Sequence, residues 1–320
     1  MRHRLTTLLL LLPRALPPRA LPLWTLLIWA LPLALHAQPS ADLPALSDEF
    51  DDPNVLSEWT RLAEVEGWTD KLKTLDVDET TEGALYLEPY PSVWFYDYTA
   101  PLLFKTVEGN FTVTTQVNVS GADGAMPATT YSLAGLMARR PRPDAPFAAD
   151  SAWAKDRENY VFLATGTTGE PGTPKIETKS AVRSRPIVKH YPRESSGWVE
   201  LRLVRLDQTV IALYRQPEGD WQIHERFYRP DLPATLQVGL MAYGDYATVR
   251  EQVWYDPWAY NTSALREADA DMQVTADYVR FRRPSLSDEA TAYVEERTLR
   301  WDDYRISNEK LLSLCPFLTE

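Results

Sequence analysis

The sequence predicts an all-β protein, a jelly-roll sandwich of two antiparallel sheets followed by a short helical tail. Three observations support this fold class. Apolar and polar residues alternate along Phe111 to Ser120, as they do in a strand with one buried face. Apolar segments of strand length recur through residues 44–284, with turn residues between them. No long stretch of helical periodicity interrupts these segments, which favours a sandwich over a mixed fold.

The predicted strands follow one another along residues 44–284, which we interpret as one domain. The strand from Phe111 places Phe111, Val113, Val117 and Val119 on one face and Thr112, Thr114, Gln116 and Asn118 on the other. Two further strands, 198–206 and 209–215, are separated only by Asp207 and Gln208, which predicts a tight hairpin. The remaining strands are expected at residues 84–90, 131–140, 158–166, 221–227, 236–243 and 277–282.

Residues 285–320 are expected to form the helical tail. The segment from Ser285 to Arg297 begins with a serine and has Glu289 close behind it, as a capped helix does. A second short helix is expected from Ser307 to Leu314, before Pro316. Docking of this tail, on the sandwich or on a second protomer, is favoured over disorder by four residues: Trp301, Tyr304, Leu311 and Leu312.

The first 37 residues are expected to form a secretory signal peptide. They contain Arg2, Arg4, Arg14 and Arg19, no acidic residue, and a Leu-rich run that ends at Ala37. A basic start, an apolar stretch and a small final residue are typical of such signals, and the prolines disfavour a spanning helix. We therefore expect cleavage after Ala37, no membrane span in the mature chain, and a secreted or periplasmic location in a bacterium. A retained anchor is the alternative.

Charge and cysteine content limit the partners and the source of stability. The chain has 33 basic and 45 acidic residues, and loss of the leader's four arginines changes the net charge from −12 to −16. Such a charge disfavours nucleic acid and anionic membranes as partners, although solubility alone also explains it. Cys315 is the sole cysteine, so no disulfide forms within the chain and a hydrophobic core must stabilise it. An inert, half-buried thiol is expected, with pairing between chains as the alternative.

Seven short motifs occur in a distinctive order between about residues 46 and 283. They are Leu46–Pro53 with Trp59, Pro101–Phe111, Ala134–Met137, Glu158–Val161, Trp198–Arg202, Arg229–Pro233 and Val238–Leu240. This order resembles bacterial concanavalin A-like lectin/glucanase domains, specifically the DUF1349 group, which also occurs as the C-terminal module of some β-xylosidases. The resemblance implies a concanavalin A-like jelly roll with a sugar-binding or accessory role. We find no attached catalytic domain in this sequence.

Enzymes of the same fold are the main functional alternative. Glycoside hydrolysis requires two facing carboxyl groups, but the Glu-x-Asp-x-(x)-Glu strand of the laminarinase-like branch is not found, and Asp269-Ala-Asp271 has no third carboxylate after it. Gln222-Ile-His224 resembles the Gln-x-His strand of alginate lyases, and residues 199–202 resemble part of their Arg-rich strand, yet the Tyr-rich closing motif is missing. We expect no catalytic residues, and we expect His224 to be a surface or sheet-edge histidine.

The candidate ligand-binding residues are aromatic or polar side chains on or beside the central strands. Sugars stack on aromatic rings while neighbouring polar groups bind their hydroxyls. Trp94, Tyr96 and Tyr98 alternate, so they share one side if this segment is a strand. Packing in the core is the alternative for each residue. The predicted site residues are Trp94, Tyr96, Arg139, Asn159, Tyr160 and Tyr243, with the loop 141–157 as the rim.

We expect no cofactor, with calcium as the open alternative. Asp48, Asp51 or Asp52 would provide oxygen ligands together with Asp277 if the two ends of the sandwich lie side by side, but no spaced Asp/Asn/Gly loop is present. The sequence therefore predicts an exported, non-catalytic protein that binds a glycan or another extracellular small ligand. A glycan-active enzyme and an envelope structural or interaction protein are the alternatives, and the oligomeric state stays open.

Overall fold

The computed structural model describes residues 43–147, 153–253 and 256–320. All of these belong to the compact unit Pro39–Glu320; the other unit is Met1–Gln38. The predicted signal peptide, residues 1–37, lies outside the described residues. Within the described ranges, no helix combines the length and the apolar character that crossing a bilayer requires.

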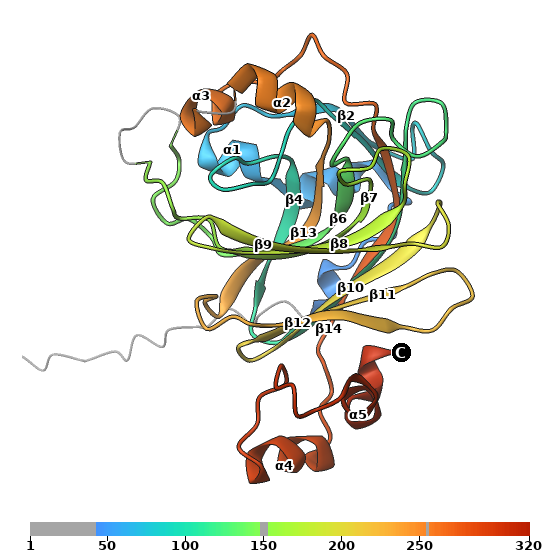
Figure 1. Ribbon diagram of the computed structural model, residues 1–320, viewed down its shortest axis with the longest axis vertical. Helices are drawn as coiled ribbons and strands as arrows, with labels where there is room; N and C mark the ends of the chain where they lie inside the picture. The colour runs from blue at the N-terminus through green and yellow to red at the C-terminus, as the bar shows by residue number, and fades with distance from the viewer. Residues whose placement is uncertain (1–42, 148–152, 254–255) are drawn as a thin grey trace, which may run out of the picture. The chain divides into compact units, whose positions relative to one another are not determined.

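The described part of the chain contains two seven-stranded antiparallel sheets, which confirms the predicted sandwich (Figure 1). Sheet I has the order β1-β4-β13-β6-β7-β8-β9, with β1 Thr60–Arg61, β4 Leu102–Glu108, β13 Thr235–Tyr243, β6 Leu133–Arg139, β7 Tyr160–Gly166, β8 Lys175–Val182 and β9 Arg185–Pro192. Sheet II has the order β12-β11-β10-β5-β14-β3-β2, with β12 Gln222–Tyr228, β11 Thr209–Arg215, β10 Val199–Leu206, β5 Phe111–Ser120, β14 Gln273–Arg282, β3 Leu85–Pro89 and β2 Leu72–Val77.

The main hydrophobic core lies between the two sheets. The alternation of β5 places Phe111 and Val117 in this core, where both are fully buried. Burial of each such side chain contributes roughly 1.5–3 kcal/mol. The predicted hairpin between β10 and β11 is confirmed, because Leu206 pairs with Thr209. At the turn, Asp207 takes a left-handed backbone conformation with φ of 54°, which aspartate tolerates better than most residues.

A second layer covers the face of sheet I that points away from sheet II (Figure 1). It consists of residues 91–101 and three short helices: α1 (Leu62–Glu66), α2 (Tyr246–Val253) and α3 (Pro257–Asn261). We call this layer the sheet I cover. Trp94, Tyr98 and Tyr260 of the cover pack in one cluster with Phe162 and Tyr243 of the sheet. The outer face of sheet I is therefore largely filled.

The tail covers the outer face of sheet II. Helices α4 (Asp288–Glu296) and α5 (Asn308–Leu314) confirm the two predicted helices, and each begins at a serine whose hydroxyl accepts a main-chain N–H, Ser287 from Ala290 and Ser307 from Lys310. Short 3₁₀ helices occur at Leu43–Leu46, Pro53–Glu58 and Pro316–Leu318. A third cluster contains Trp301 and Leu311 of the tail together with residues of β10, β11 and the segment before β12.

Two expectations for the tail need correction. Tyr304 is 88% exposed and does not take part in docking. Cys315 is fully buried rather than half-buried. Burial raises the pKa of the Cys315 thiol to about 12, so the group stays protonated and inert.

His224 generates a prediction on the pH dependence of stability. It is 9% exposed on β12, and its Nδ1 lies 3.2 Å from Thr178 Oγ1. Burial lowers the pKa of His224 from 6.5 to about 4. The unfolded chain therefore binds this proton more tightly, and acidification from pH 6.5 to 4.5 should cost about 2 kcal/mol of stability.

Urea unfolding at a series of pH values checks this expectation. In the His224→Gln variant this part of the acid-induced loss should disappear. The exposed His190 provides the control, and the His190→Gln variant should retain the loss. If the free energy of unfolding depends on pH equally in both variants and in the wild type, His224 is not the source of the loss.

Candidate functional site

The structure buries most of the side chains that the sequence suggested as ligand contacts. Trp94, Arg139, Tyr160 and Tyr243 are each 0% exposed, and Asn159 is 7% exposed. These residues therefore do not form an open aromatic platform. Burial under the sheet I cover leaves Trp94 and Tyr160 without free surface, so neither side chain is available to a ligand.

Trp94, Tyr96 and Tyr98 do not lie in a strand, so the condition under which they would share one side is not met. Residues 91–101 form a turn with an isolated bridge between Phe95 and Tyr98, not a strand. Tyr96 takes a left-handed conformation with φ of 48° and is 46% exposed. Trp94 and Tyr98 are buried in the cover, where Trp94 packs edge-on against Tyr160 at a centroid distance of 5.6 Å.

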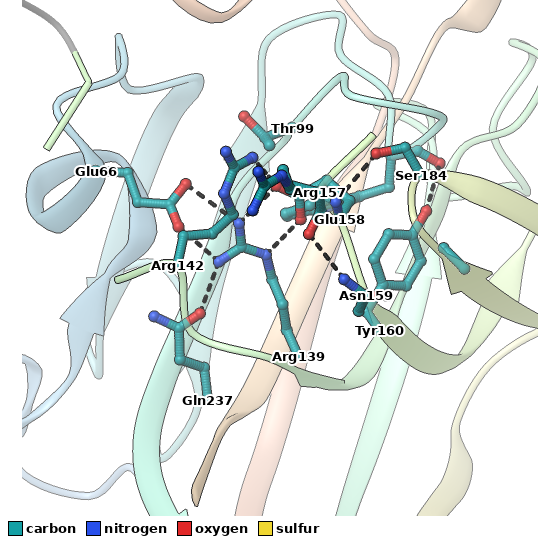
Figure 2. A network of polar contacts seen from close by, with 12 residues as sticks. Glu66, Thr99, Arg139, Arg142, Arg157, Glu158, Asn159, Tyr160, Ser184 and Gln237 are labelled. Carbon is teal, nitrogen blue, oxygen red and sulfur yellow. Dashed lines mark hydrogen bonds and ion pairs between the residues drawn. The ribbon is translucent and has the colours of Figure 1, made fainter. Parts of the chain in front are cut away.

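Arg139 is the centre of a buried ionic network (Figure 2). Its Nη1 donates to Glu66 Oε1 and to Gln237 Oε1, both at 2.7 Å, and its Nε donates to Glu158 Oε2 at 2.7 Å. Arg142 Nη1 adds a contact of 3.2 Å to Glu158 Oε1. The network continues through Arg142, which also pairs with Asp144 at 3.1 Å. Arg139 therefore connects the cover to sheet I and is not available to a ligand.

The protonation equilibria of this network follow from its burial. Burial by itself raises the pKa of Glu158, but the charges and hydrogen bonds of Arg139 and Arg142 outweigh it and hold the pKa below its usual value. Burial opposes the charged form of Arg139 too, yet the two carboxylates keep the arginine pKa above its ordinary value. Asn159 lies beside the network and has a structural role, since its side chain accepts the Arg183 N–H and donates to the Arg157 carbonyl.

A pocket lies on the outer face of sheet I, and we call it the aromatic pocket. It has a volume of about 220 Å³. Tyr131 and Tyr246 form one wall, with ring centroids 5.5 Å apart and the rings nearly perpendicular. Tyr131 has φ of 53°, a conformation that costs a non-glycine residue of the order of 1 kcal/mol and is concentrated at functional sites. The lining residues are Val93, Phe95, Tyr131, Lys179, Val188, His190, Tyr243 and Tyr246.

Polar groups lie at the floor of this pocket. Lys179 Nζ donates to Tyr243 Oη at 3.0 Å and to the Trp94 carbonyl at 2.9 Å, and it lies 4.9 Å from the Phe162 ring centroid. Tyr243 Oη donates to Glu177 Oε1 at 3.4 Å. Glu177 is fully buried, and its Oε2 has no hydrogen-bond partner. An unsatisfied buried oxygen of this kind requires an explanation such as a catalytic or binding role or an ordered water.

Burial acts on both charged groups of the floor. It raises the pKa of Glu177 above the usual range, against the opposing effect of Lys179. It likewise lowers the pKa of Lys179, against the effect of Glu177. Perturbed pairs of this kind are concentrated at functional sites, although structural ion pairs produce them too.

Strand register explains how the floor assembles. Side chains alternate between the faces of a strand, so Glu177 and Lys179 of β8 both point to the outer face, while Ile176 packs in the main core. In the register of sheet I, Glu177 pairs with Ala164 on β7 and with His190 on β9. Because Ala164 is small, the Tyr243 side chain can reach across the sheet to Glu177.

Sequence reasoning identified one residue of this pocket as a ligand contact, Tyr243, and missed the others. Glu177, Lys179 and His190 lie in strands that were not predicted, because charged residues alternate there with small or polar ones. Tyr246 begins α2, a helix too short to show a periodic pattern. Only the pairing of β7, β8 and β9 brings these side chains together.

The described residues do not support the calcium hypothesis. The two ends of the sandwich do lie side by side, since Asp48 and Val279 exchange main-chain hydrogen bonds of 2.8 Å. However, the Asp48 carboxylate accepts the Trp59 indole N–H at 2.8 Å, and Asp52 caps a 3₁₀ helix. In the part of the chain that the structure describes, no group of three or more His, Cys, Asp or Glu could hold a metal ion.

The Arg139 network generates a prediction on stability. The Arg139→Met variant leaves Glu66 and Glu158 buried without their main partner, and it should lower the free energy of unfolding by about 3–5 kcal/mol. Arg280 is a matched control, because it makes a comparable two-point contact with Glu49 on the surface. The Arg280→Met variant should lose less than about 1 kcal/mol. Chemical denaturation compares the two, and similar small losses would contradict a structural role for Arg139.

Comparisons with known proteins give likenesses of fold. No protein-family model matches the chain, and no curated protein matches it. A protein of unknown function from Saccharomyces cerevisiae is 14% identical, with a TM-score of 0.48 over 72% of this chain and 98% of the yeast chain.

Two further structures extend these likenesses. The GH43 protein BlXynB from Bacillus licheniformis is 12% identical, with a TM-score of 0.48 over 74% of this chain, which spans 39% of that protein's length. The metal-free lectin I-B4 from Griffonia simplicifolia is 14% identical, with a TM-score of 0.43 over 73% of this chain and 98% of the lectin.

Proposed function

We propose that this chain is a carbohydrate-binding β-sandwich protein without catalytic activity, and that the aromatic pocket is its sugar site. The observation that carries the proposal is the composition of this pocket. Tyrosine and phenylalanine rings surround a cavity of about 220 Å³, and Lys179, His190 and the Tyr243 hydroxyl lie among them. Apolar walls with a few convergent polar groups are the usual design of small-ligand sites.

The chemistry of a sugar ring matches this arrangement. The C–H face of a pyranose stacks on an aromatic ring, for which Tyr131 and Tyr246 are the candidates. Hydroxyl groups of the sugar would exchange hydrogen bonds with Lys179 and His190, while the buried Tyr243 hydroxyl accepts from Lys179 and holds it in place. Glu177 is a positioning residue, because it lies below the lining and accepts from the Tyr243 hydroxyl.

The pocket favours binding over hydrolysis. Glycoside hydrolases need two carboxyl groups, either about 5–5.5 Å or about 6.5–9.5 Å apart, on opposite sides of the scissile bond. Among the described residues that line the aromatic pocket, none is Asp or Glu. Glu177 lies below the lining, where it accepts from the Tyr243 hydroxyl. A single carboxylate in this position does not provide the facing pair that hydrolysis needs.

We further propose that the chain belongs to the DUF1349 group and that it is exported from a bacterium. The order of motifs between residues 46 and 283 supports the first proposal, and the composition of residues 1–37 supports the second.

The export proposal predicts a defined N-terminus. Expression of the full chain in a bacterial host should give a mature protein outside the cytoplasm whose sequence begins at Gln38, because Ala37 ends the signal pattern. N-terminal sequencing of the fractionated protein checks this. A form that lacks residues 1–37 is the control and should stay in the cytoplasm. Recovery of the full chain with Met1 intact in the cytoplasm would contradict export.

Binding to a glycan array followed by titration of the best ligand tests the sugar site. The Tyr246→Ala variant should weaken binding about fivefold, since one stacking ring contributes of the order of 1 kcal/mol. The Tyr243→Phe variant keeps the ring, removes the hydroxyl and should also weaken binding. Tyr304→Ala is the matched control, because this tyrosine is 88% exposed in the tail. Absence of glycan binding by the wild type, or unchanged affinity in both pocket variants, would overturn the proposal.

A further inference from the structure

A second pocket lies on the outer face of sheet II, beside the end of the tail. It has a volume of about 200 Å³ and lies over β5, β10, β11 and β14. We call it the arginine pocket, because five arginines line it in a chain whose net charge is −12: Arg202, Arg215, Arg280, Arg282 and Arg283. Strand register brings them together, since Thr114 pairs with both Arg202 and Arg280.

Carboxylates neutralise only some of these arginines. Arg215 pairs with Glu200, and Arg280 pairs with Glu49. Arg202, Arg282 and Arg283 have no Asp or Glu side chain as an ion-pair partner within the described residues. Like charges on neighbouring strands repel one another, so this arrangement is unfavourable unless an anion compensates it.

Arg202 is the arginine of this pocket that contacts the end of the tail. It is 6% exposed, and its guanidinium donates to main-chain oxygens of Leu318 and Glu320 at 2.6 and 3.0 Å. Its Nε donates to Thr114 Oγ1 at 2.8 Å. Burial lowers the pKa of Arg202 to about 10, which means that its surroundings oppose the positive charge.

Thr112 is an independent sign of a missing ligand. This residue lines the arginine pocket from β5 and is 6% exposed, yet its Oγ1 has no hydrogen-bond partner. It pairs in the sheet with Arg282, whose side chain makes no hydrogen bond or ion pair within the described ranges. A buried hydroxyl donor beside an uncompensated arginine is an arrangement that an oxyanion would satisfy at both points.

We propose that the arginine pocket binds a compact oxyanion, a phosphate or sulfate group that is either free or carried on a larger ligand. Guanidinium groups match the oxygens of such anions in pairs of parallel hydrogen bonds. The anion accepts hydrogen bonds from Arg282 and from the Thr112 hydroxyl. This site is separate from the aromatic pocket, which lies on the other sheet.

Docking of the tail alone is the competing explanation of the arginine cluster. Arg202 does contact the tail, and Arg283 donates to the carbonyls of Glu108 and Asn110. A docking role does not account for Arg282 or for the Thr112 hydroxyl, because neither has a partner there. These two residues are therefore the ones to change.

Isothermal titration calorimetry of the full chain with sodium phosphate and with sodium sulfate tests the proposal, with sodium chloride holding the ionic strength constant. The wild type should show saturable binding. The Arg282→Gln variant should weaken it at least fivefold, and Thr112→Val should weaken it about threefold while the fold keeps its stability, since only a hydroxyl is lost. Arg185→Gln is the matched control, because Arg185 is an exposed strand arginine of sheet I. This variant should bind phosphate and sulfate with the affinity of the wild type.

The outcomes separate the proposal from its alternatives. Absence of saturable binding by the wild type, or an equal loss in the Arg185→Gln variant, would overturn the proposal. Unchanged affinity in both Arg282→Gln and Thr112→Val would overturn it as well. A sulfated polysaccharide used as a further probe identifies the source of the group: tighter binding than inorganic sulfate supports a carried group, and equal binding supports a free anion.

Discussion

Burial of both faces of sheet I is the constraint on which the rest of the structure depends. Strands β6 and β7 are buried along their whole length, so sheet II covers one of their faces and a second layer must cover the other. Antiparallel sheets commonly leave one face to solvent. Here residues 91–101 and three short helices fill it with aromatic side chains such as Trp94 and Tyr260. The cover therefore belongs to the fold, and ligand sites are confined to the places that it leaves open.

The Arg139 network is a consequence of the same cover. Arg139 ends β6 on the outer face, where α1 and the segment before β7 exclude water. A guanidinium in such a place is tolerated only with carboxylates and further acceptors around it. Glu66 of α1 and Glu158 supply the charges, and Gln237 supplies an additional oxygen. The network therefore fixes α1 against sheet I, and an arginine that looked like a sugar ligand in the sequence is a structural residue.

Much of the sandwich could be predicted from the sequence, whereas the site could not. The alternation of β5 and the two-residue turn after β10 are local signals, and both are confirmed. The capping serines Ser287 and Ser307 likewise predicted the tail helices. Strands β8 and β9 escaped prediction because Glu177 and Lys179 interrupt one apolar face and because β9 is largely exposed. Residue type also could not tell a buried tyrosine from one that lines a pocket, since that depends on where the cover ends.

The two proposed sites share a physical origin. In each case a covering layer stops before the sheet does, and the polar side chains left at its edge lack part of their hydrogen bonding. The edge of the sheet I cover leaves Glu177 Oε2 unsatisfied under the aromatic pocket, and the end of the tail leaves Thr112 Oγ1 unsatisfied in the arginine pocket. The two pockets differ in composition: the first is lined mainly by aromatic rings with one buried lysine, and the second mainly by arginines. Because a buried group that lacks its partner costs about 1–3 kcal/mol, the arginine pocket favours an oxyanion that supplies the contact missing at Thr112. The aromatic pocket instead offers rings and a few polar groups, which suit a hydroxyl-rich ring.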